Sequence, residues 1–156
     1  MNQILGFFLV AVFAIFVGSQ LTEGFLLLPH WKSLPAAEFY AYYAGFGPVI
    51  GRFYTILTIV AAVIPILLSI YCAVKKTRAL RYAMVSSLFT IAVLAFFYIY
   101  FKGANQQFLD AALEAEQLKA ELITWGNWHW SRVGMEFLAL LFLILALNRL
   151  KTEKRS

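Results

Sequence analysis

The chain has 156 residues, of which 62% are hydrophobic and 13% are charged, and its mean hydropathy is +0.76. Soluble domains carry about 25% charged residues, so this composition excludes an ordinary soluble domain and indicates one membrane domain over residues 1–156. The net charge of +5 does not indicate a nucleic-acid partner, because the basic residues flank apolar runs, where the positive-inside rule predicts them. The lone cysteine, Cys72, excludes an internal disulfide.

Residues 4–28 form the first apolar run, which can cross a bilayer because about 20 residues suffice. A signal peptide is the competing interpretation, but the run lacks a basic start and is too long for one, so we expect a true span. Gly18 and Gly24 would permit close approach of a neighbouring helix. Helical spacing predicts one shared face for Gln20, Glu23, Leu27 and His30.

The second apolar run covers residues 48–74, and Arg52 lies one turn inside its start. The connector before it, residues 31–46, is rich in tyrosine and begins with Trp31, which suits the headgroup layer. Pro35 is typical of the first turn of a helix. We therefore expect a short helix in the membrane interface here.

The third apolar run covers residues 82–101 and the fourth covers residues 128–147. Between them, residues 104–122 carry apolar side chains at helical spacing and mostly acidic side chains elsewhere. This pattern predicts an amphipathic helix with an acidic wet side, which either extends the bundle or packs across its mouth.

The basic residues predict the orientation of the four spans. They gather between the second and third runs, over residues 75–81, and after the fourth run in a tail that includes Lys154 and Arg155. The positive-inside rule places this loop and both termini in the cytoplasm and the two aromatic-rich connectors outside. We expect an all-α, four-helix membrane bundle in the inner membrane of a bacterium.

Unusual side chains gather where the last polar loop gives way to the fourth run. Residues 125–136 include three tryptophans, and helical spacing places His129, Arg132 and Glu136 on one face. Ionisable groups are costly in hydrocarbon, so these side chains are expected to face protein or trapped water and to mark a functional site.

The first and fourth spans run in opposite directions, so their polar residues can meet. In the first span Glu23 precedes His30, and in the fourth His129 precedes Glu136 by the same number of positions. If the two spans are neighbours, the histidines share one level and the glutamates share another, about 10 Å deeper. Arg52 enters from the same side at a comparable depth.

Three interpretations of this cluster stay open. Its carboxylates and arginines can form buried ion pairs that fix the register of the bundle, in which case Glu136→Gln would lower the melting temperature. Its donors can instead bind copper, iron or zinc, with His30, His129, Glu23 and Glu136 as ligands. In the third interpretation a buried glutamate takes a proton from a lipid-soluble substrate without a metal, and arginine holds the anion.

Several short motifs resemble the anthrone oxygenase-like family of small membrane proteins. They are Thr22-Glu23-Gly24 followed by Pro29, the Phe39-Tyr40 connector that leads to Arg52, and the tryptophan-rich start of the last span with Arg132. The resemblance implies an oxygenase-type reaction on a flat apolar molecule, as in members that oxidise anthrones to anthraquinones, either with or without a bound cofactor. The chain departs from the family pattern before Arg132, where Asn127, His129 and Ser131 stand in place of the family's asparagine.

We therefore expect a membrane oxidoreductase, oxygenase-like, whose polar pocket near the outer face receives a hydrophobic small molecule from the lipid. Glu23 or Glu136 would be the base, and Arg52 and Arg132 would stabilise an anion. The histidines would act as metal ligands or proton relays. The alternative is a non-enzymatic protein that binds metal or lipid or belongs to a larger membrane complex. Either protein could form a homo-oligomer.

Overall fold

The computed structural model describes residues 3–153, and these residues form an all-α bundle without a strand. The chain makes four long rods, and a short π-turn lies inside the first and the third. This arrangement confirms the predicted all-α four-helix architecture. In chain order the elements are α1 (Gln3–Thr22), η1 (Glu23–Leu27), α2 (Leu28–Ser33), α3 (Ala36–Val74), α4 (Leu80–Phe96), η2 (Phe97–Phe101), α5 (Lys102–Leu109) and α6 (Ala115–Glu153).

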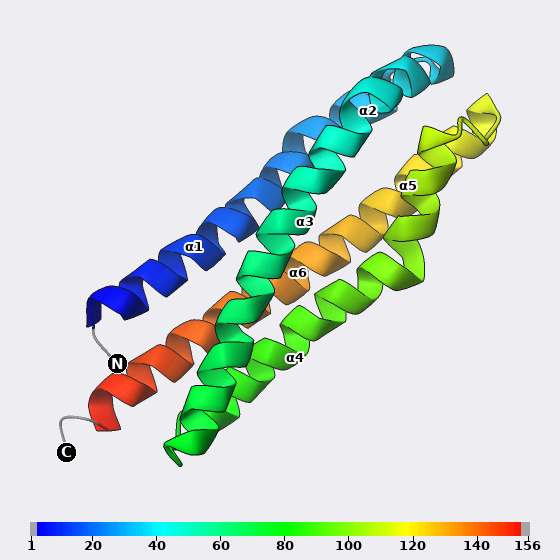
Figure 1. The fold of residues 1–156 in the computed structure, drawn as a ribbon. Helices are drawn as coiled ribbons and strands as arrows, with labels where there is room; N and C mark the ends of the chain where they lie inside the picture. The colour runs from blue at the N-terminus through cyan, green and yellow to red at the C-terminus, as the bar shows by residue number, and fades with distance from the viewer. Residues whose placement is uncertain (1–2, 154–156) are drawn as a thin grey trace.

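Each rod is long and apolar enough to cross a membrane, so by length and composition the chain is a multi-pass membrane protein. Figure 1 shows the start of α1, the end of α6 and the α3–α4 connection at one end of the bundle. The α2–α3 and α5–α6 connections lie at the other end. The predicted basic tail residues Lys154 and Arg155 lie outside the described residues.

The prediction of a separate interfacial helix over residues 31–46 is wrong. Helix α2 ends at Ser33, and α3 begins at Ala36 and continues unbroken through the second span. Pro35 occupies the N-cap position of α3, where its carbonyl oxygen accepts a bond from Phe39 N–H at 2.9 Å. A proline at a helix start leaves no needed donor missing, so the tyrosine-rich segment extends the rod beyond the span that was predicted.

The predicted amphipathic helix over residues 104–122 is also wrong, because the chain reverses direction inside it. Helix α5 ends at Leu109, and α6 begins at Ala115. Periodicity identified inward positions on both sides of the turn, since Phe108 and Leu118 are buried in the same core, but Ala112 and Ala115, which the same spacing also predicts to face inward, are exposed. It did not reveal the reversal, because the apolar spacing happens to continue across the turn.

The turn after α5 has the hydrogen bonds of a Schellman motif. Ala112 N–H donates to the Gln107 carbonyl at 3.0 Å, and Ala111 N–H donates to the Phe108 carbonyl at 3.4 Å. Ala111 adopts φ 50, a left-handed conformation that this motif requires and that glycine usually provides. At the start of α6, Gln117 Oε1 accepts a bond from Glu114 N–H at 3.0 Å, as in a capping box.

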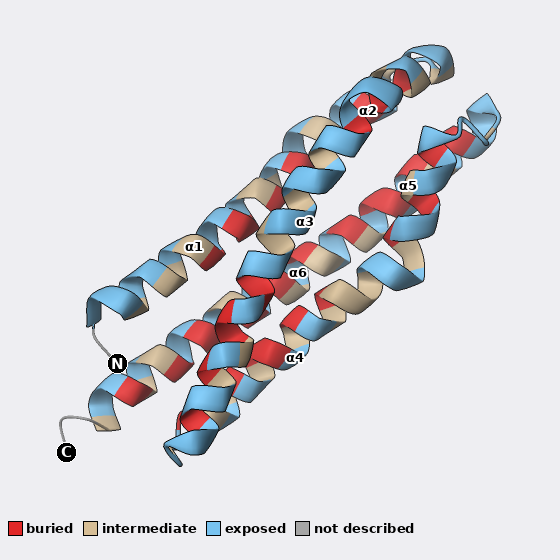
Figure 2. Cartoon of the chain, viewed as in Figure 1, coloured by how far each residue is buried: buried red, intermediate tan, exposed pale blue. Residues whose placement is uncertain are grey.

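The bundle has two hydrophobic cores, and the buried residues in Figure 2 follow the inward faces of the rods. The core near the termini is largely aliphatic, whereas the core near the α2–α3 and α5–α6 connections is aromatic. On α1 and α6 the buried polar residues lie between the two cores. The aliphatic core consists of Phe13, Phe16, Val17, Ala61, Ile64, Leu68, Cys72, Ala79, Ala83, Ala139, Leu143, Ala146 and Leu150. The aromatic core consists of Leu28, Trp31, Phe39, Tyr43, Phe101, Ala104, Phe108, Leu118, Leu122 and Trp125.

We predict that Ala111→Gly stabilises the protein by up to about 1 kcal/mol, because glycine removes the steric cost of the left-handed conformation. The matched control is Ala112→Gly, one residue along the same turn, where φ is not positive. Thermal unfolding in detergent should show a higher melting temperature for Ala111→Gly alone. Equal shifts in both variants would contradict the role assigned to this turn.

Candidate functional site

The first rod carries its polar side chains into the bundle through a π-turn. Helix α1 buries Gln20, and η1 buries Glu23 and Gly24. A π-turn accommodates one extra residue, which rotates everything beyond it by about 100° relative to a regular α-helix. Leu28 and Trp31 therefore face the core after the turn.

His30 does not join the cluster, so the predicted face of four residues is wrong beyond Glu23. In an unbroken α-helix, Leu27 and His30 would lie on the same face as Glu23. The π-turn shifts the helical phase, so the residue that follows each of them takes that position instead. His30 is exposed and lies edge-on to the ring of Tyr42, with ring centroids 5.6 Å apart.

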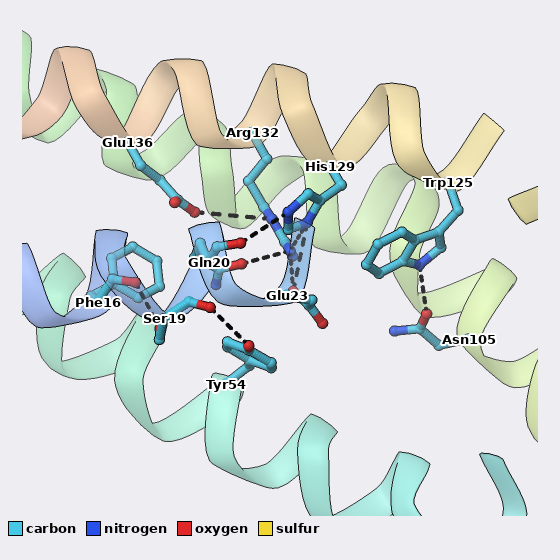
Figure 3. Close-up of polar contacts among 10 residues, drawn as sticks. All are labelled: Phe16, Ser19, Gln20, Glu23, Tyr54, Asn105, Trp125, His129, Arg132 and Glu136. Carbon is cyan, nitrogen blue, oxygen red and sulfur yellow. Dashed lines mark hydrogen bonds and ion pairs between the residues drawn. The ribbon is translucent and has the colours of Figure 1, made fainter. Parts of the chain in front are cut away.

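The guanidinium of Arg132 is the centre of the cluster (Figure 3). Its Nη2 lies 2.8 Å from Glu23 Oε2, 2.7 Å from Gln20 Oε1 and 2.7 Å from His129 Nδ1. The side chains of Arg132 and Glu23 are 12% and 5% exposed, so little solvent screens their charges. Arg132 Cζ also lies 4.4 Å from the ring centroid of Phe101, in a cation–π contact. A buried ion pair thus joins the first rod to the last.

The hydrogen bonds of His129 define its tautomer. Arg132 can only donate, so His129 Nδ1 accepts its bond, and the Gln20 carbonyl can only accept, so His129 Nε2 carries the proton. The Nε2–O distance is 3.1 Å. His129 is fully buried, and its ring lies parallel to the ring of Trp125 with centroids 5.1 Å apart. The imidazole is therefore held by the indole ring of Trp125 against its face and by a hydrogen bond at each of its two nitrogens.

Gly24 lets the first rod approach the histidine closely. A Cβ atom at this position would lie 2.8 Å from His129 Nε2 and 2.8 Å from the indole of Trp130. Any larger residue would separate η1 from α6 and lengthen the contacts of Glu23. The same role predicted for Gly18 is not observed, because a Cβ atom there would meet nothing within 4 Å.

Glu136 lies deeper in the bundle and has a different environment from Glu23. It is 1% exposed, and neither of its carboxyl oxygens has a hydrogen-bond partner among the described residues. Its Oε1 lies 3.9 Å from Arg132 Nε, which is too long for a hydrogen bond, and that nitrogen is also buried without a hydrogen-bond partner. The cluster thus holds one carboxylate bonded to the arginine and one that is not.

Arg52 does not reach the cluster. It is exposed on the outward face of α3, beside Val49, Phe53 and Ile56, which are 64%, 52% and 57% exposed. In a bilayer this face contacts lipid. Counting about 1.5 Å per residue from Lys75 places Arg52 about 34 Å along the helix, near the far boundary of a ~30 Å hydrocarbon layer. A long side chain there can extend to the headgroups.

Tyr54 takes the inward position on α3 that Arg52 was predicted to hold. Its hydroxyl donates to the Ser19 carbonyl at 3.0 Å and so joins α3 to α1 beside the cluster (Figure 3). The sequence signal for Tyr54 was the spacing of small and apolar residues on α3, which marks the buried face. That face is formed by residues 43, 47, 50, 54, 57, 61 and 64.

The cluster does not fit a metal ion. Among residues 3–153, no group of three or more histidine, cysteine, aspartate or glutamate side chains could hold one. His129 Nδ1 and Glu23 Oε2 are 3.5 Å apart, but both atoms already accept a bond from Arg132, and this uses the only lone pair of Nδ1. The predicted metal ligands are thus not brought together, since His30 faces outward and a guanidinium occupies the centre.

We predict that Glu23→Gln destabilises the protein by about 3 kcal/mol, because it leaves the buried Arg132 charge without its partner. Glu136→Gln should leave the melting temperature unchanged or raise it, since it replaces a buried carboxylate that accepts no hydrogen bond. This reverses the expectation from sequence that Glu136 would be the arginine's partner. Thermal unfolding of both variants, with exposed Glu116→Gln as the control, tests whether Glu23→Gln loses more stability than Glu136→Gln. A larger loss of stability in Glu136→Gln would contradict the prediction.

No protein-family model matches the chain, and neither the curated proteins nor the solved structures give a significant match. The resemblance to the anthrone oxygenase-like family therefore stays a prediction from short motifs. The geometry of the cluster carries the functional argument.

Proposed function

We propose that the protein is a membrane enzyme in which Glu136 takes a proton from a hydrophobic, weakly acidic molecule. The observation that carries this proposal is the environment of Glu136, a fully buried carboxyl whose oxygens accept no hydrogen bond from the described residues. A general base needs an available lone pair within reach of the proton that it removes. Glu23 differs because its Oε2 accepts a bond from Arg132 at 2.8 Å, and this charge-assisted bond makes its carboxylate a weaker base than one without a hydrogen bond.

Arg132 would stabilise the anion that proton removal creates. Its Nε lies 3.9 Å from Glu136 Oε1 and has no hydrogen-bond partner among the described residues. A substrate C–H group that contacts Glu136 could give up its proton to the carboxylate, and Nε could then donate to the substrate oxygen on which the negative charge of the enolate collects. A fixed cation in a site that excludes water stabilises developing charge strongly.

The substrate would reach the site from the lipid. The cluster lies between two hydrophobic cores, and Phe16 and Phe101 lie beside it. An apolar molecule entering between α1 and α3 would pass the Tyr54–Ser19 bond that links them. The hydrophobic surroundings favour a flat apolar compound over a soluble metabolite.

The resemblance to anthrone oxygenases supports an oxidation after the proton transfer, with dioxygen as the oxidant. In such a reaction a ring methylene loses two hydrogens, one oxygen atom becomes the new carbonyl oxygen and the other leaves as water. Proton removal is the step for which this chain supplies residues, because the carbanion or enolate reacts with oxygen more readily than its conjugate acid.

We predict that Glu136→Gln lowers kcat for anthrone oxidation by roughly 100-fold or more, the usual contribution of a general base. The assay would follow oxygen uptake and quinone absorbance with detergent-purified protein, after subtraction of spontaneous oxidation. Glu116→Gln, on the exposed side of α6, should keep wild-type activity. Equal rates for wild type and Glu136→Gln would overturn the proposal.

A non-enzymatic role is the second candidate, and the Glu23–Arg132 ion pair favours it. At 2.8 Å between nearly buried side chains, this pair links the first rod to the last and can fix the register of the bundle on its own. The protein would then be a lipid-binding protein or a subunit of a larger membrane complex. Loss of stability in Glu23→Gln without any catalytic activity in the wild type would support this role.

The inner end of the bundle is proposed to face the cytoplasm of a bacterial cell. Lys75, Lys76, Arg78 and Arg81 gather at the α3–α4 connection, and Glu153 accepts a bond from Arg78 N–H at 3.3 Å, which brings the end of α6 to the same level. The opposite end carries more acidic than basic side chains. This asymmetry is what the positive-inside rule requires.

We predict that a cysteine at exposed Ala115, in a Cys72→Ala background, reacts with a membrane-impermeant thiol reagent in intact cells. The reason is that Ala115 begins α6 at the end away from the basic connection. A cysteine at Lys76 serves as the opposite control and should react only after permeabilisation. The reverse pattern would invert the proposed orientation.

A further inference from the structure

The hydrogen bonds of Arg132 are unevenly distributed over its guanidinium. Nη2 has two hydrogens but lies within 2.8 Å of three acceptors, on Gln20, Glu23 and His129. Nε has one hydrogen and no hydrogen-bond partner among the residues that the structure describes. Since Glu136 lies 3.9 Å from Nε, a small movement of the guanidinium would bond it to Glu136 instead.

His129 is the acceptor that helps to hold the guanidinium away from Glu136. Gln20 and Glu23 have flexible side chains, whereas the imidazole is a rigid ring whose Nδ1 must point at Arg132 for the bond to form. A rotation of the ring by 180° would replace Nδ1 with a carbon and break both of its hydrogen bonds. The orientation of this one ring therefore contributes to which carboxylate the arginine pairs with.

A chain of two contacts reaches the His129 ring from the outer end of the third rod. Trp125 lies parallel to the imidazole, with 10° between the ring planes and 5.1 Å between centroids. The indole Nε1–H of Trp125 donates to Asn105 Oδ1 at 3.0 Å, and Figure 3 shows this bond on the far side of the indole from Arg132. Asn105 lies on α5, just after the π-turn η2, and it is not part of either hydrophobic core.

We propose that Asn105 is a positioning residue that keeps Glu136 available as a base. The amide oxygen of Asn105 fixes the plane of the Trp125 indole, the indole fixes the plane of the imidazole, and the imidazole holds Arg132 on Glu23. Without Asn105 the indole tilts, the Nδ1 bond weakens and the guanidinium moves to Glu136. This inference rests on the proposed function only in assigning the basic role to Glu136; the contacts themselves stand independently.

The test compares Asn105→Leu, which removes the acceptor, with Asn105→Asp, which keeps an oxygen at the same place. Asn127→Ala is the control, because Asn127 is exposed one turn from the cluster on α6. The sequence has two histidines, so a His30→Gln background leaves His129 as the single histidine signal. Circular dichroism and thermal unfolding first establish that each variant is folded.

Nitrogen-15 NMR of the labelled imidazole then reports directly which ring nitrogen of His129 carries the proton. Wild type, Asn105→Asp and Asn127→Ala should show a single tautomer with the proton on Nε2. Asn105→Leu should show averaging of the two ring nitrogen signals. An unchanged tautomer in folded Asn105→Leu would overturn the proposal. If Asn105→Leu does not fold, loss of the single tautomer in Asn105→Asp would overturn the proposal instead.

Labelling with dicyclohexylcarbodiimide, a lipid-soluble reagent for buried carboxyl groups, reports whether the carboxyl group of Glu136 is free to react or is bonded to Arg132. We expect Asn105→Leu to lower labelling of Glu136 about fivefold or more, the lower range of coupling between linked sites, because a carboxylate bonded to arginine reacts poorly. Unchanged labelling would contradict the inference. If the labelling and NMR results hold while wild type does not oxidise anthrone, the positioning role stands and the proposed reaction fails.

Discussion

The ion pair between Glu23 and Arg132 is the interaction on which the arrangement of the bundle depends. It joins the first rod to the last at the level where the aliphatic core gives way to the aromatic core. Two charges so far from solvent are tolerated only with good geometry and further hydrogen bonds, which Gln20 and His129 provide. The close approach at Gly24 brings Glu23 within reach, and the π-turn that begins at Glu23 brings Leu28 and Trp31 to the core beyond it.

Helical spacing predicted the part of the site that lies on α6, because that helix runs unbroken through it. His129, Arg132 and Glu136 share a face, as periodicity requires, and Glu23 meets them because the first and last spans are antiparallel neighbours. His30 was misplaced because a π-turn shifts the helical phase by one residue. Nothing in the apolar pattern of residues 23–27 distinguishes a π-turn from an α-helical turn.

The ends of the helices were harder to predict than their existence. An apolar run marks only the part of a helix that crosses a bilayer, because the helix can continue with polar residues beyond the lipid. The extensions of α3 and α6 were therefore predicted as connectors. Arg52 shows a related difficulty. One turn inside a span, a charged residue can face the interior or reach the headgroups, and the two differ by only a rotation of the helix. The buried face through Tyr54 decides between them.

The depth of Glu136 has an electrical consequence. In the proposed orientation, with the basic residues near Arg149 at the cytoplasmic boundary, the helix rises about 20 Å to Glu136, which leaves about 10 Å of a ~30 Å hydrocarbon layer beyond it. A proton that arrives from the outer surface would then cross about one third of the transmembrane field. Because a full crossing changes its energy by about 2.3 kcal/mol per 100 mV, occupancy of this carboxyl would shift by roughly 0.8 kcal/mol per 100 mV with the voltage of the cell.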